Sequence, residues 1–371
     1  MTASSPRRAE VAPDPREIAR RFWLGGEISS VRPHGNGHIN TTFRVETLGA
    51  RAFILQRING AVFRDPGSLM ANLGRVTRHL RARLEAEGAS DLDRRVLSLV
   101  PSLEGRDYVL DEAGGYWRCF PFIEGVKERP SIESPQQAFE IARAFGNFQR
   151  LLSDLPGEPL HPSIPHFHDA GRRFDALTAA VESDVLNRAN QAVPEIRFAF
   201  GNRPLSQFFA GFIARGEMNE RITHNDTKLD NLLFDAASGE ALCVIDLDTV
   251  MPGLALYDFG DLARSAACTA LEDERNLDRV RVDPRIFGAL AQGFIEGTGG
   301  SLSTLERENL VGATQVFAFT LGVRFLTDFL EGDSYFRIHR EGHNLDRARA
   351  QFALLRDLQE QEEALRSVLT A

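Results

Sequence analysis

The sequence predicts an α+β protein of two lobes, an antiparallel sheet with one long helix followed by a mostly helical lobe. The chain has 371 residues, and one hydrophobic core seldom serves a chain of this length. Strand-like segments fill the first third, whereas helical periodicity dominates from Ser134 onward. Strands followed by helices are typical of α+β folds. We therefore expect a disordered arm over residues 1–13, an N-terminal lobe over 14–123 and a C-terminal lobe over 124–371.

The composition favours a soluble globular enzyme and argues against nucleic-acid binding. The net charge is −9, with 43% hydrophobic and 26% charged residues, and no sustained basic stripe is present. The three cysteines lie far apart in apolar surroundings, which indicates free thiols in a reducing compartment. We find neither the apolar core of a signal peptide nor 18 uninterrupted apolar residues. We expect a cytoplasmic protein with no membrane partner, monomeric or weakly dimeric.

The N-terminal lobe is predicted from alternating apolar positions and turn residues. Its expected helices are 15–23 and 66–86, and its expected strands are 27–32, 41–47, 51–58, 96–100, 106–110 and 116–123. Gly35 and Gly37 interrupt the first two strands. Glycines let backbone N–H groups approach phosphates closely, but taken alone these two indicate an ordinary hairpin turn.

The C-terminal lobe is predicted to be helical, with one hairpin. The expected helices are 135–152, 170–183, 195–215, 258–269, 284–296, 305–330 and 344–369. The hairpin pairs 232–234 with 241–245 across a turn at 235–239. This pairing would bring Asn231 close to Asp246, with Asp226 and Lys228 just before it. Such a group of oxygens beside a lysine suits Mg²⁺ and a phosphate chain.

Ordered motifs then identify a resemblance to protein-kinase-like phosphotransferases. Residues 224–231 read H-N-D-T-K-L-D-N, which matches the H-x-D-x-x-x-x-N catalytic loop, and Asp246 follows Asn231 by fifteen residues. The chain is similar to the aminoglycoside and choline phosphotransferase branch. More narrowly it resembles the N-acetylhexosamine 1-kinase family through these strings: G-N-G-H-I-N-T-T-F, I-D-L-D-T-V-M-P-G, D-F-G-D and R-F-L-T-D-F-L-E-G-D-S-Y-F.

The resemblance implies transfer of the γ-phosphoryl group of ATP to the anomeric hydroxyl of N-acetylglucosamine or N-acetylgalactosamine. Asp226 would be the base and Lys228 a point charge over the γ-phosphate. Asn231 and Asp246 would hold Mg²⁺. In a continued strand Asp248 would share a face with Asp246, where it would bind a second Mg²⁺ or cap the following turn.

For ATP, the resemblance assigns phosphates to the loop at Gly35 and Gly37, and adenine to the backbone of 120–123, chiefly Phe120 and Phe122. The strand 53–58 departs from the pattern, because Gln56 or Arg57 stands where kinases carry lysine.

We expect Gln56 to face the nucleotide, because it alternates with Phe53 and Leu55. The next helix offers Gly74 in place of the usual acid.

For the sugar, the resemblance assigns His38, Arg324, Tyr335 and Ser265. His38 would alternatively stabilise its loop, and Arg324 would alternatively pair with Asp328 four residues later. Members of the resembled family carry an aromatic residue where Ser265 stands, so the pocket here would be larger or lack a stacking surface.

Two other functions stay open at this point. The same fold could phosphorylate an aminoglycoside, choline, homoserine or N-acetylmuramate, and Glu331, Asp333 and Glu341 could form the acidic pocket that a cationic acceptor needs. The absent strand lysine would also fit a catalytically silent kinase-like module. The joint presence of Asp226, Lys228, Asn231 and Asp246 argues against that module.

Overall fold

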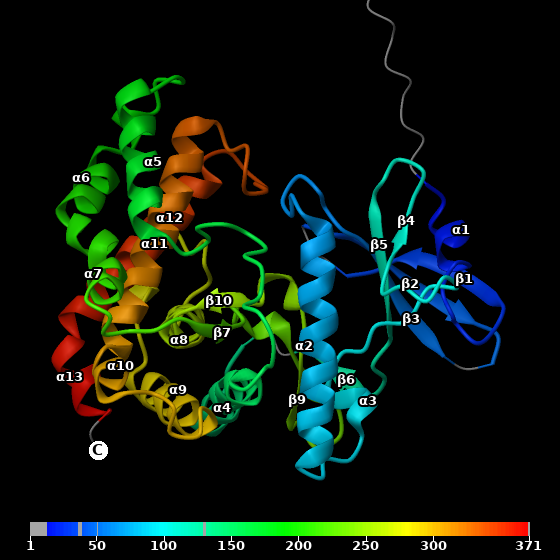
Figure 1. Cartoon of the computed structure of the whole chain (residues 1–371). Helices are drawn as coiled ribbons and strands as arrows, with labels where there is room; N and C mark the ends of the chain where they lie inside the picture. Colours follow the sequence, from blue (N-terminus) through cyan, green and yellow to red (C-terminus); the bar gives the residue numbers. More distant parts are fainter. Residues whose placement is uncertain (1–12, 36–38, 50, 129–130, 370–371) are drawn as a thin grey trace, which may run out of the picture. The chain divides into compact units, whose positions relative to one another are not determined.

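The N-terminal strands, in which apolar and polar residues alternate, form the antiparallel sheet that the sequence predicts, and it has five strands. The strand order is β1-β2-β3-β5-β4. The computed structural model describes residues 13–35, 39–49, 51–128 and 131–369 (Figure 1). The expected arm therefore lies outside the described residues, apart from Pro13. The strands are β1 (Ile28–Pro33), β2 (Thr41–Thr47), β3 (Ala52–Arg57), β4 (Val109–Leu110) and β5 (Tyr116–Pro121).

The chain divides into two units. Unit 1 comprises residues up to Arg81 together with Asp91–Glu124, and unit 2 comprises Ala82–Ser90 together with Gly125 onward. The helices that begin in unit 1 are α1 (Pro15–Ala19), α2 (Pro66–Ala86) and α3 (Leu92–Arg95). The last turn of α2 counts with unit 2.

The two faces of the unit 1 sheet differ in polarity. One face is apolar and packs against α1 through buried side chains such as Val45, Phe53 and Leu55. Directly paired residues share a face in an antiparallel sheet. The pairing of Thr42 with Gln56, and of Gln56 with Arg118, therefore places these three on the opposite face.

Unit 2 is a helical body around one large apolar core. Helix α11 packs against α5, α8 and α12, and α4 packs against α9 (Figure 1). The helices are α4 (Pro135–Leu152), α5 (Ala170–Ser183), α6 (Val193–Gly201), α7 (Phe208–Ala214), α8 (Ala255–Ala266), α9 (Pro284–Gly297), α10 (Thr304–Glu308), α11 (Leu310–Glu331), α12 (His343–Glu360) and α13 (Glu362–Ser367). Short 3₁₀ turns are η1 (Ala189–Gln191), η2 (Arg203–Gln207), η3 (Leu229–Asn231), η4 (Leu247–Thr249) and η5 (Leu277–Arg279).

Helix α11 is long and apolar enough to cross a membrane, but 83% of its most apolar window is buried inside unit 2. Its composition is explained by its place in the core, where helices are apolar on every side.

Two small sheets support the loops of unit 2. β8 (Leu232–Asp235) and β9 (Ala241–Val244) form the expected hairpin, and β6 (Val126–Lys127) pairs with β8. β7 (Arg221–Thr223) pairs with β10 (Met251–Gly253), which the sequence did not predict because strands of three residues carry little periodicity.

Several expected elements were wrong in extent; the expected helix 344–369, for example, divides into α12 and α13. Residues 96–100 are not a strand: Val100 donates one hydrogen bond to the Cys119 carbonyl (2.8 Å), and the next residue, Pro101, cannot donate. The expected helix 195–215 is broken at η2, which contains Pro204. The expected helix 305–330 divides at Asn309, whose backbone leaves the helical region.

Candidate active site

The loop after β7 is held in place by one buried carboxylate. Asp258, in the first turn of α8, is fully buried. It accepts hydrogen bonds from the backbone N–H of His224 (3.0 Å) and Asn225 (2.7 Å) and from the Gln149 side chain (2.6 Å). The Thr227 hydroxyl donates to the Asp258 carbonyl (2.6 Å). Asn225, held by these hydrogen bonds, adopts a left-handed backbone (φ 65°). Asp258 therefore fixes the residues immediately before and after Asp226.

His224 supports the same loop and is fixed as one tautomer. The Asp226 backbone N–H donates to His224 Nδ1 (3.3 Å), so Nδ1 is unprotonated. Nε2–H then donates to the Ile245 carbonyl (2.9 Å). The ring also lies edge-on to Phe145 and Phe148. A buried imidazole with both nitrogens hydrogen-bonded positions its neighbours and does not react.

Asp226 sits at the centre of a small polar cluster. Lys228 Nζ lies 3.0 Å from Asp226 Oδ2, and Asn231 Nδ2 donates to that oxygen (2.9 Å) and to the Asp226 carbonyl (2.8 Å). Burial would raise the pKa of Asp226, but the Lys228 ammonium and the hydrogen bonds outweigh it and hold the pKa below its ordinary value. Asp226 is therefore ionised at neutral pH, as a proton acceptor must be.

Lys228 faces several carboxylates. Burial would lower the pKa of Lys228, yet Asp226, Asp246 and Asp261 outweigh burial and raise it. Its side chain is 46% exposed. Lys228 thus keeps its charge and can meet an anionic group from solvent.

The hairpin brings the predicted metal ligands near one another. The Ile245 backbone N–H donates to the Asn231 carbonyl (2.9 Å), so Asn231 and Asp246 stand one residue apart across the β8–β9 pair. Because Asn231 Nδ2 is directed to Asp226, its Oδ1 remains as an oxygen ligand. Among the described residues no three His, Cys, Asp or Glu side chains cluster as a metal site. The donors present suit Mg²⁺ held partly by phosphate oxygens.

The expectation that Asp246 and Asp248 share a strand face was wrong. β9 ends at Val244, and Asp246 adopts a left-handed backbone (φ 57°, ψ 58°) that starts η4. Asp248 is 2% exposed within that 3₁₀ turn. Side chains alternate between two faces only while the backbone stays extended, so the alternation ends at a left-handed residue. No local sequence signal predicted that the strand would end before Asp246.

Removing Lys228 should move the acidic limb of the pH–rate profile to higher pH. The Lys228 ammonium helps to lower the pKa of Asp226, whereas burial of the carboxylate raises it. In Lys228→Met the effect of burial persists without the ammonium, so Asp226 becomes protonated at a higher pH. In the parent protein the loss of kcat/KM caused by protonation of Asp226 should lie at a pH below the ordinary pKa of an aspartate. The profile of kcat/KM against pH measures this shift. Lys127→Met, on exposed β6, should leave the limb in place; an unmoved limb in Lys228→Met would contradict the coupling.

On the nucleotide side, the sheet register separates Gln56 from Arg57. Gln56 lies on the polar face, opposite Phe53 and Leu55 as predicted. Arg57 points to the other face, where its Nε lies 3.4 Å from the buried carboxylate of Asp111.

Phe120 and Phe122 follow from the same register. Phe120 pairs with Ile54, and the Phe122 backbone N–H donates to the Ala52 carbonyl (2.9 Å). The guanidinium carbon of Arg44 lies 4.2 Å from the centre of the Phe122 ring, and the His34 ring contacts the same ring edge-on. The Phe122 N–H is thus already engaged by the sheet, and its carbonyl is the group that remains for a ligand. Gly35 has a left-handed backbone (φ 73°), whereas Gly37 and His38 lie outside the described residues.

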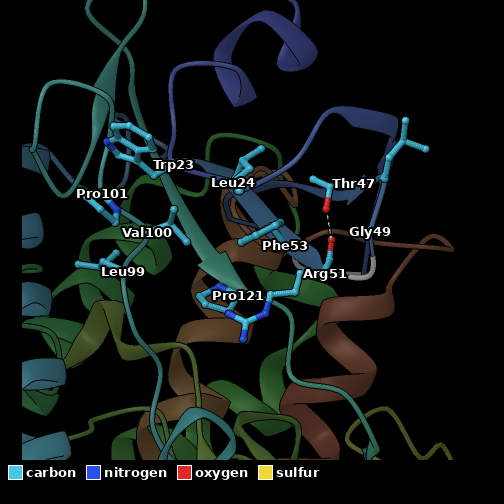
Figure 2. Close-up of a pocket in the computed structure, with 12 residues that line it drawn as sticks. Trp23, Leu24, Thr47, Gly49, Arg51, Phe53, Leu99, Val100, Pro101 and Pro121 are labelled. Carbon is cyan, nitrogen blue, oxygen red and sulfur yellow. Dashed lines mark hydrogen bonds between the residues drawn. The ribbon is translucent and has the colours of Figure 1, made fainter.

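A cavity of about 500 Å³ opens on unit 1 but belongs to the apolar face (Figure 2). Its wall includes Phe53 and Pro121, which pair directly on that face. Figure 2 also shows the hydrogen bond from the Thr47 hydroxyl to the Arg51 carbonyl (2.8 Å) at its rim. The cavity therefore does not contain Gln56, Phe120 or Phe122.

On the acceptor side, Arg324 contacts Tyr335 and not Asp328. Arg324 Nη2 donates to the Tyr335 hydroxyl (3.4 Å), and its guanidinium lies over the rings of Tyr335 and Phe336. Asp328 accepts the backbone N–H groups of residues 334–336 and the Asn344 side chain instead. The alternative of an Arg324–Asp328 pair was therefore wrong. Tyr335 is 68% exposed, so the pair can be approached from solvent.

Two residues near this group were not assigned by the sequence. His168 Nε2 lies 2.9 Å from the Asn225 carbonyl, and its ring contacts Tyr257 and Phe317. Burial lowers the pKa of His168 to about 4, so it is neutral and Nδ1 can accept a hydrogen bond. Arg173 lies in α5, and burial and then Arg324 lower its pKa. The H-F-H-D sequence of residues 166–169 is the signal that could have indicated His168, whereas nothing in the sequence pointed to Arg173.

Ser265 is placed one helical turn beyond Asp261 on α8. Its hydroxyl donates back to the Asp261 and Leu262 carbonyls (3.2 and 3.1 Å), so it presents only an acceptor to any ligand. Arg264 is buried and bonds Asp261 (3.1 Å).

The comparisons with known proteins agree with this arrangement. The model of the phosphotransferase enzyme family (APH) matches residues 30–288. Similar solved structures include an aminoglycoside phosphotransferase from Alicyclobacillus acidocaldarius (TM-score 0.61, 14% identity, covering 96% of this chain and 99% of that chain). They also include the amicoumacin kinase hAmiN in complex with AMP-PNP and Ca²⁺ (0.58, 12%, 91% and 91%). A third is a choline/ethanolamine kinase family protein from Mesorhizobium loti (0.54, 18%, 96% and 98%).

At these identities the solved structures show the shared fold, an antiparallel sheet followed by a helical part. The family match spans well over half of the 371 residues and includes every residue of the loop and hairpin described above. The chain belongs to the phosphotransferase enzyme family, whose kinase-like members use ATP.

Proposed function

We propose that the protein transfers the γ-phosphoryl group of ATP to the anomeric C1 hydroxyl of an N-acetylhexosamine. The support for the acceptor is electrostatic. Arg173 and Arg324 lie close enough that Arg324 lowers the pKa of Arg173. Neither forms an ion pair with a carboxylate in the part of the chain that the structure describes. Two such cations repel an ammonium acceptor and suit a neutral sugar rich in hydroxyl and carbonyl oxygens.

Each group then has one task. Asp226 accepts the C1 hydroxyl proton as the sugar oxygen bonds to the γ-phosphorus and the bond to ADP breaks. A hemiacetal hydroxyl is more acidic than an ordinary alcohol, so a carboxylate of lowered pKa is basic enough. Lys228 meets the γ-phosphate as a point charge. Asn231 and Asp246 would hold Mg²⁺, which neutralises phosphate charge when bound.

The sugar would be oriented by donors on α11 and its following loop. Arg324 and the Tyr335 hydroxyl can bond ring hydroxyls or the N-acetyl carbonyl. His168 Nδ1 can accept from a further hydroxyl. Ser265 leaves more space than an aromatic residue would, which bears on which sugar fits best.

The main alternative is an amine acceptor, because the similar structures include a choline/ethanolamine kinase family protein. Of the three acidic residues that could form a pocket for such an acceptor, one is already neutralised by other side chains. Asp333 is bound by Arg188 (2.6 Å) and by Asn344 (2.9 Å), and its side chain is only 5% exposed. Glu331 and Glu341 are exposed.

An acceptor panel with ADP release as readout tests the proposal. N-acetylglucosamine, N-acetylgalactosamine and N-acetylmuramate are compared with choline, ethanolamine and an aminoglycoside. We expect turnover with the sugars, and activity confined to the amines would overturn the proposal. Arg324→Met should raise the KM for the sugar about tenfold or more, the cost of a hydrogen bond from a charged group, without changing the KM for ATP. Arg337→Met, in the exposed loop that follows α11, is the matched control.

A further inference from the structure

A buried carboxylate near the end of α11 holds the loop that follows this helix. Asp328 is 3% exposed. Its Oδ1 accepts the backbone N–H groups of Ser334 (2.9 Å) and Tyr335 (2.8 Å), and its Oδ2 accepts that of Phe336 (2.9 Å). Hydrogen bonds to an ionised acceptor are stronger than those between neutral groups. Three consecutive N–H groups on one carboxylate therefore fix the path of the backbone through Tyr335.

A second layer of side chains holds the same loop. Asn344 on α12 is fully buried and donates to Asp328 Oδ2 (2.8 Å) and to Asp333 Oδ1 (2.9 Å). Arg188 donates to Asp333 Oδ2 (2.6 Å) and to the Phe329 carbonyl (2.7 Å). Asp333 has a left-handed backbone (φ 57°), which costs free energy in a residue other than glycine and persists where its surroundings enforce it. The loop is thus held against its local preference.

The side chain presented by this loop contributes little to the stability of the fold. Tyr335 is 68% exposed, so it buries little apolar area. Its hydroxyl accepts from Arg324 Nη2 (3.4 Å), and the Arg324 guanidinium lies over its ring. Arg324 and Asp328 are four residues apart on α11, which places them one helical turn from each other. One helix therefore carries both the arginine of the acceptor group and the carboxylate that holds the tyrosine beside it.

We propose that Asp328 is a positioning residue for the acceptor, which acts by fixing the loop that presents Tyr335 next to Arg324. Asp328 contacts neither the acceptor nor the nucleotide itself. The inference rests on the proposed function, because it takes Arg324 and Tyr335 as the groups that meet the acceptor. Its consequence is that loss of Asp328 weakens acceptor binding and leaves ATP binding and the chemical step as they are. In this respect Asp328 serves the acceptor loop as Asp258 serves the catalytic loop.

Steady-state kinetics of Asp328→Asn test this role. Asparagine replaces one carboxylate oxygen by an amide donor, which cannot accept from a backbone N–H group, so part of the loop is released. We expect the KM for N-acetylglucosamine to rise about three- to tenfold, as for one lost neutral hydrogen bond to the sugar. The KM for ATP and kcat should not change. An unchanged KM for the sugar in the folded variant would overturn the role of Asp328.

Asp357→Asn is the matched control, because Asp357 is a buried carboxylate that holds a different segment of unit 2. Asp357 is 4% exposed and accepts the Val282 backbone N–H (2.7 Å) and the Gln361 side chain (2.6 Å). Asp357→Asn should lower the melting temperature about as much as Asp328→Asn does, yet leave the KM for the sugar unchanged. An equal rise of that KM in both variants would show a general loss of stability and contradict the proposal.

A double-mutant cycle shows whether Asp328 acts through Tyr335. In the background of Tyr335→Ala, Asp328→Asn should raise the KM for the sugar no further, because residues that act as one unit are not additive. Independent increases would contradict the positioning role. If Asp328→Asn does not fold, Asp328→Glu replaces it, which keeps the charge but displaces the carboxylate: a raised KM for the sugar alone supports the proposal, and an unchanged one contradicts it.

Failure of the sugar proposal is distinguishable from failure of this inference. A parent protein that phosphorylates amines and no sugar would overturn the sugar proposal. The same variants are then compared by their KM for ethanolamine. A rise in Asp328→Asn that Asp357→Asn lacks would still support the positioning role, and equal values would contradict it.

Discussion

We expect Asp226→Asn to lower kcat by about 10²- to 10⁴-fold, the contribution of a positioned general base, while the protein stays folded and still binds ATP. The amide cannot accept the acceptor proton, yet it is nearly the same size and can still bond Asn231 and Lys228 through its oxygen. Initial rates of ADP release at saturating ATP and sugar measure the effect.

Asp230→Asn is the matched control for this result. Asp230 lies four residues further along the same loop, in η3, and its side chain is exposed. The Asp230→Asn substitution removes the same charge from a nearby exposed position. Its kcat should therefore stay within about twofold of that of the parent protein, as for other surface substitutions. Unchanged turnover in Asp226→Asn would remove the base from the mechanism.

We expect Asp246→Asn to abolish most activity and to weaken the response to Mg²⁺. Asp246 is the charged member of the proposed ligand pair, and its left-handed backbone fixes where the carboxylate stands at the end of the hairpin. A divalent ion contributes several kcal/mol to charge stabilisation, so the expected loss in kcat is about a thousandfold or more. Titration of activity with Mg²⁺ at fixed ATP should also show a higher half-saturating concentration.

Asp235→Asn is the matched control, because it removes a carboxylate charge at the turn end of the same hairpin, away from the proposed ligand pair. Its oxygen accepts from the backbone N–H groups of Ala237 and Ser238, and asparagine keeps that acceptor. Its Mg²⁺ dependence should match that of the parent protein. An Asp246→Asn variant with the parent's Mg²⁺ dependence would exclude Asp246 as a ligand.

Elements with strong local signals could be predicted from the sequence. Helix α4 begins where Ser134 caps its N-terminus and Pro135 takes the first position, and it has the predicted bounds. Helix α5 likewise begins after the Asp169 cap. The β8–β9 hairpin follows from a turn whose Gly239 has φ 75°. These features depend on neighbours in the chain, which a sequence displays.

The parts of the site that depend on distant contacts could not be predicted in the same way. Asp258 meets Gln149 across 109 residues, and Arg118 meets Gln56 across 62. Asp246 leaves the strand because of a local backbone conformation that its neighbours do not announce. The motif of residues 224–231 located the loop, but only the folded chain shows that one buried carboxylate holds it.

The structure of the reaction product tests the central proposal most directly. ATP, Mg²⁺ and N-acetylglucosamine are incubated with the protein, and the product is examined by ¹H and ³¹P NMR. We expect phosphorus coupled to the anomeric proton, a product without a reducing end, and an ester stable to alkali but labile in acid. A phosphorylated sugar that keeps its reducing end would contradict transfer to the C1 hydroxyl.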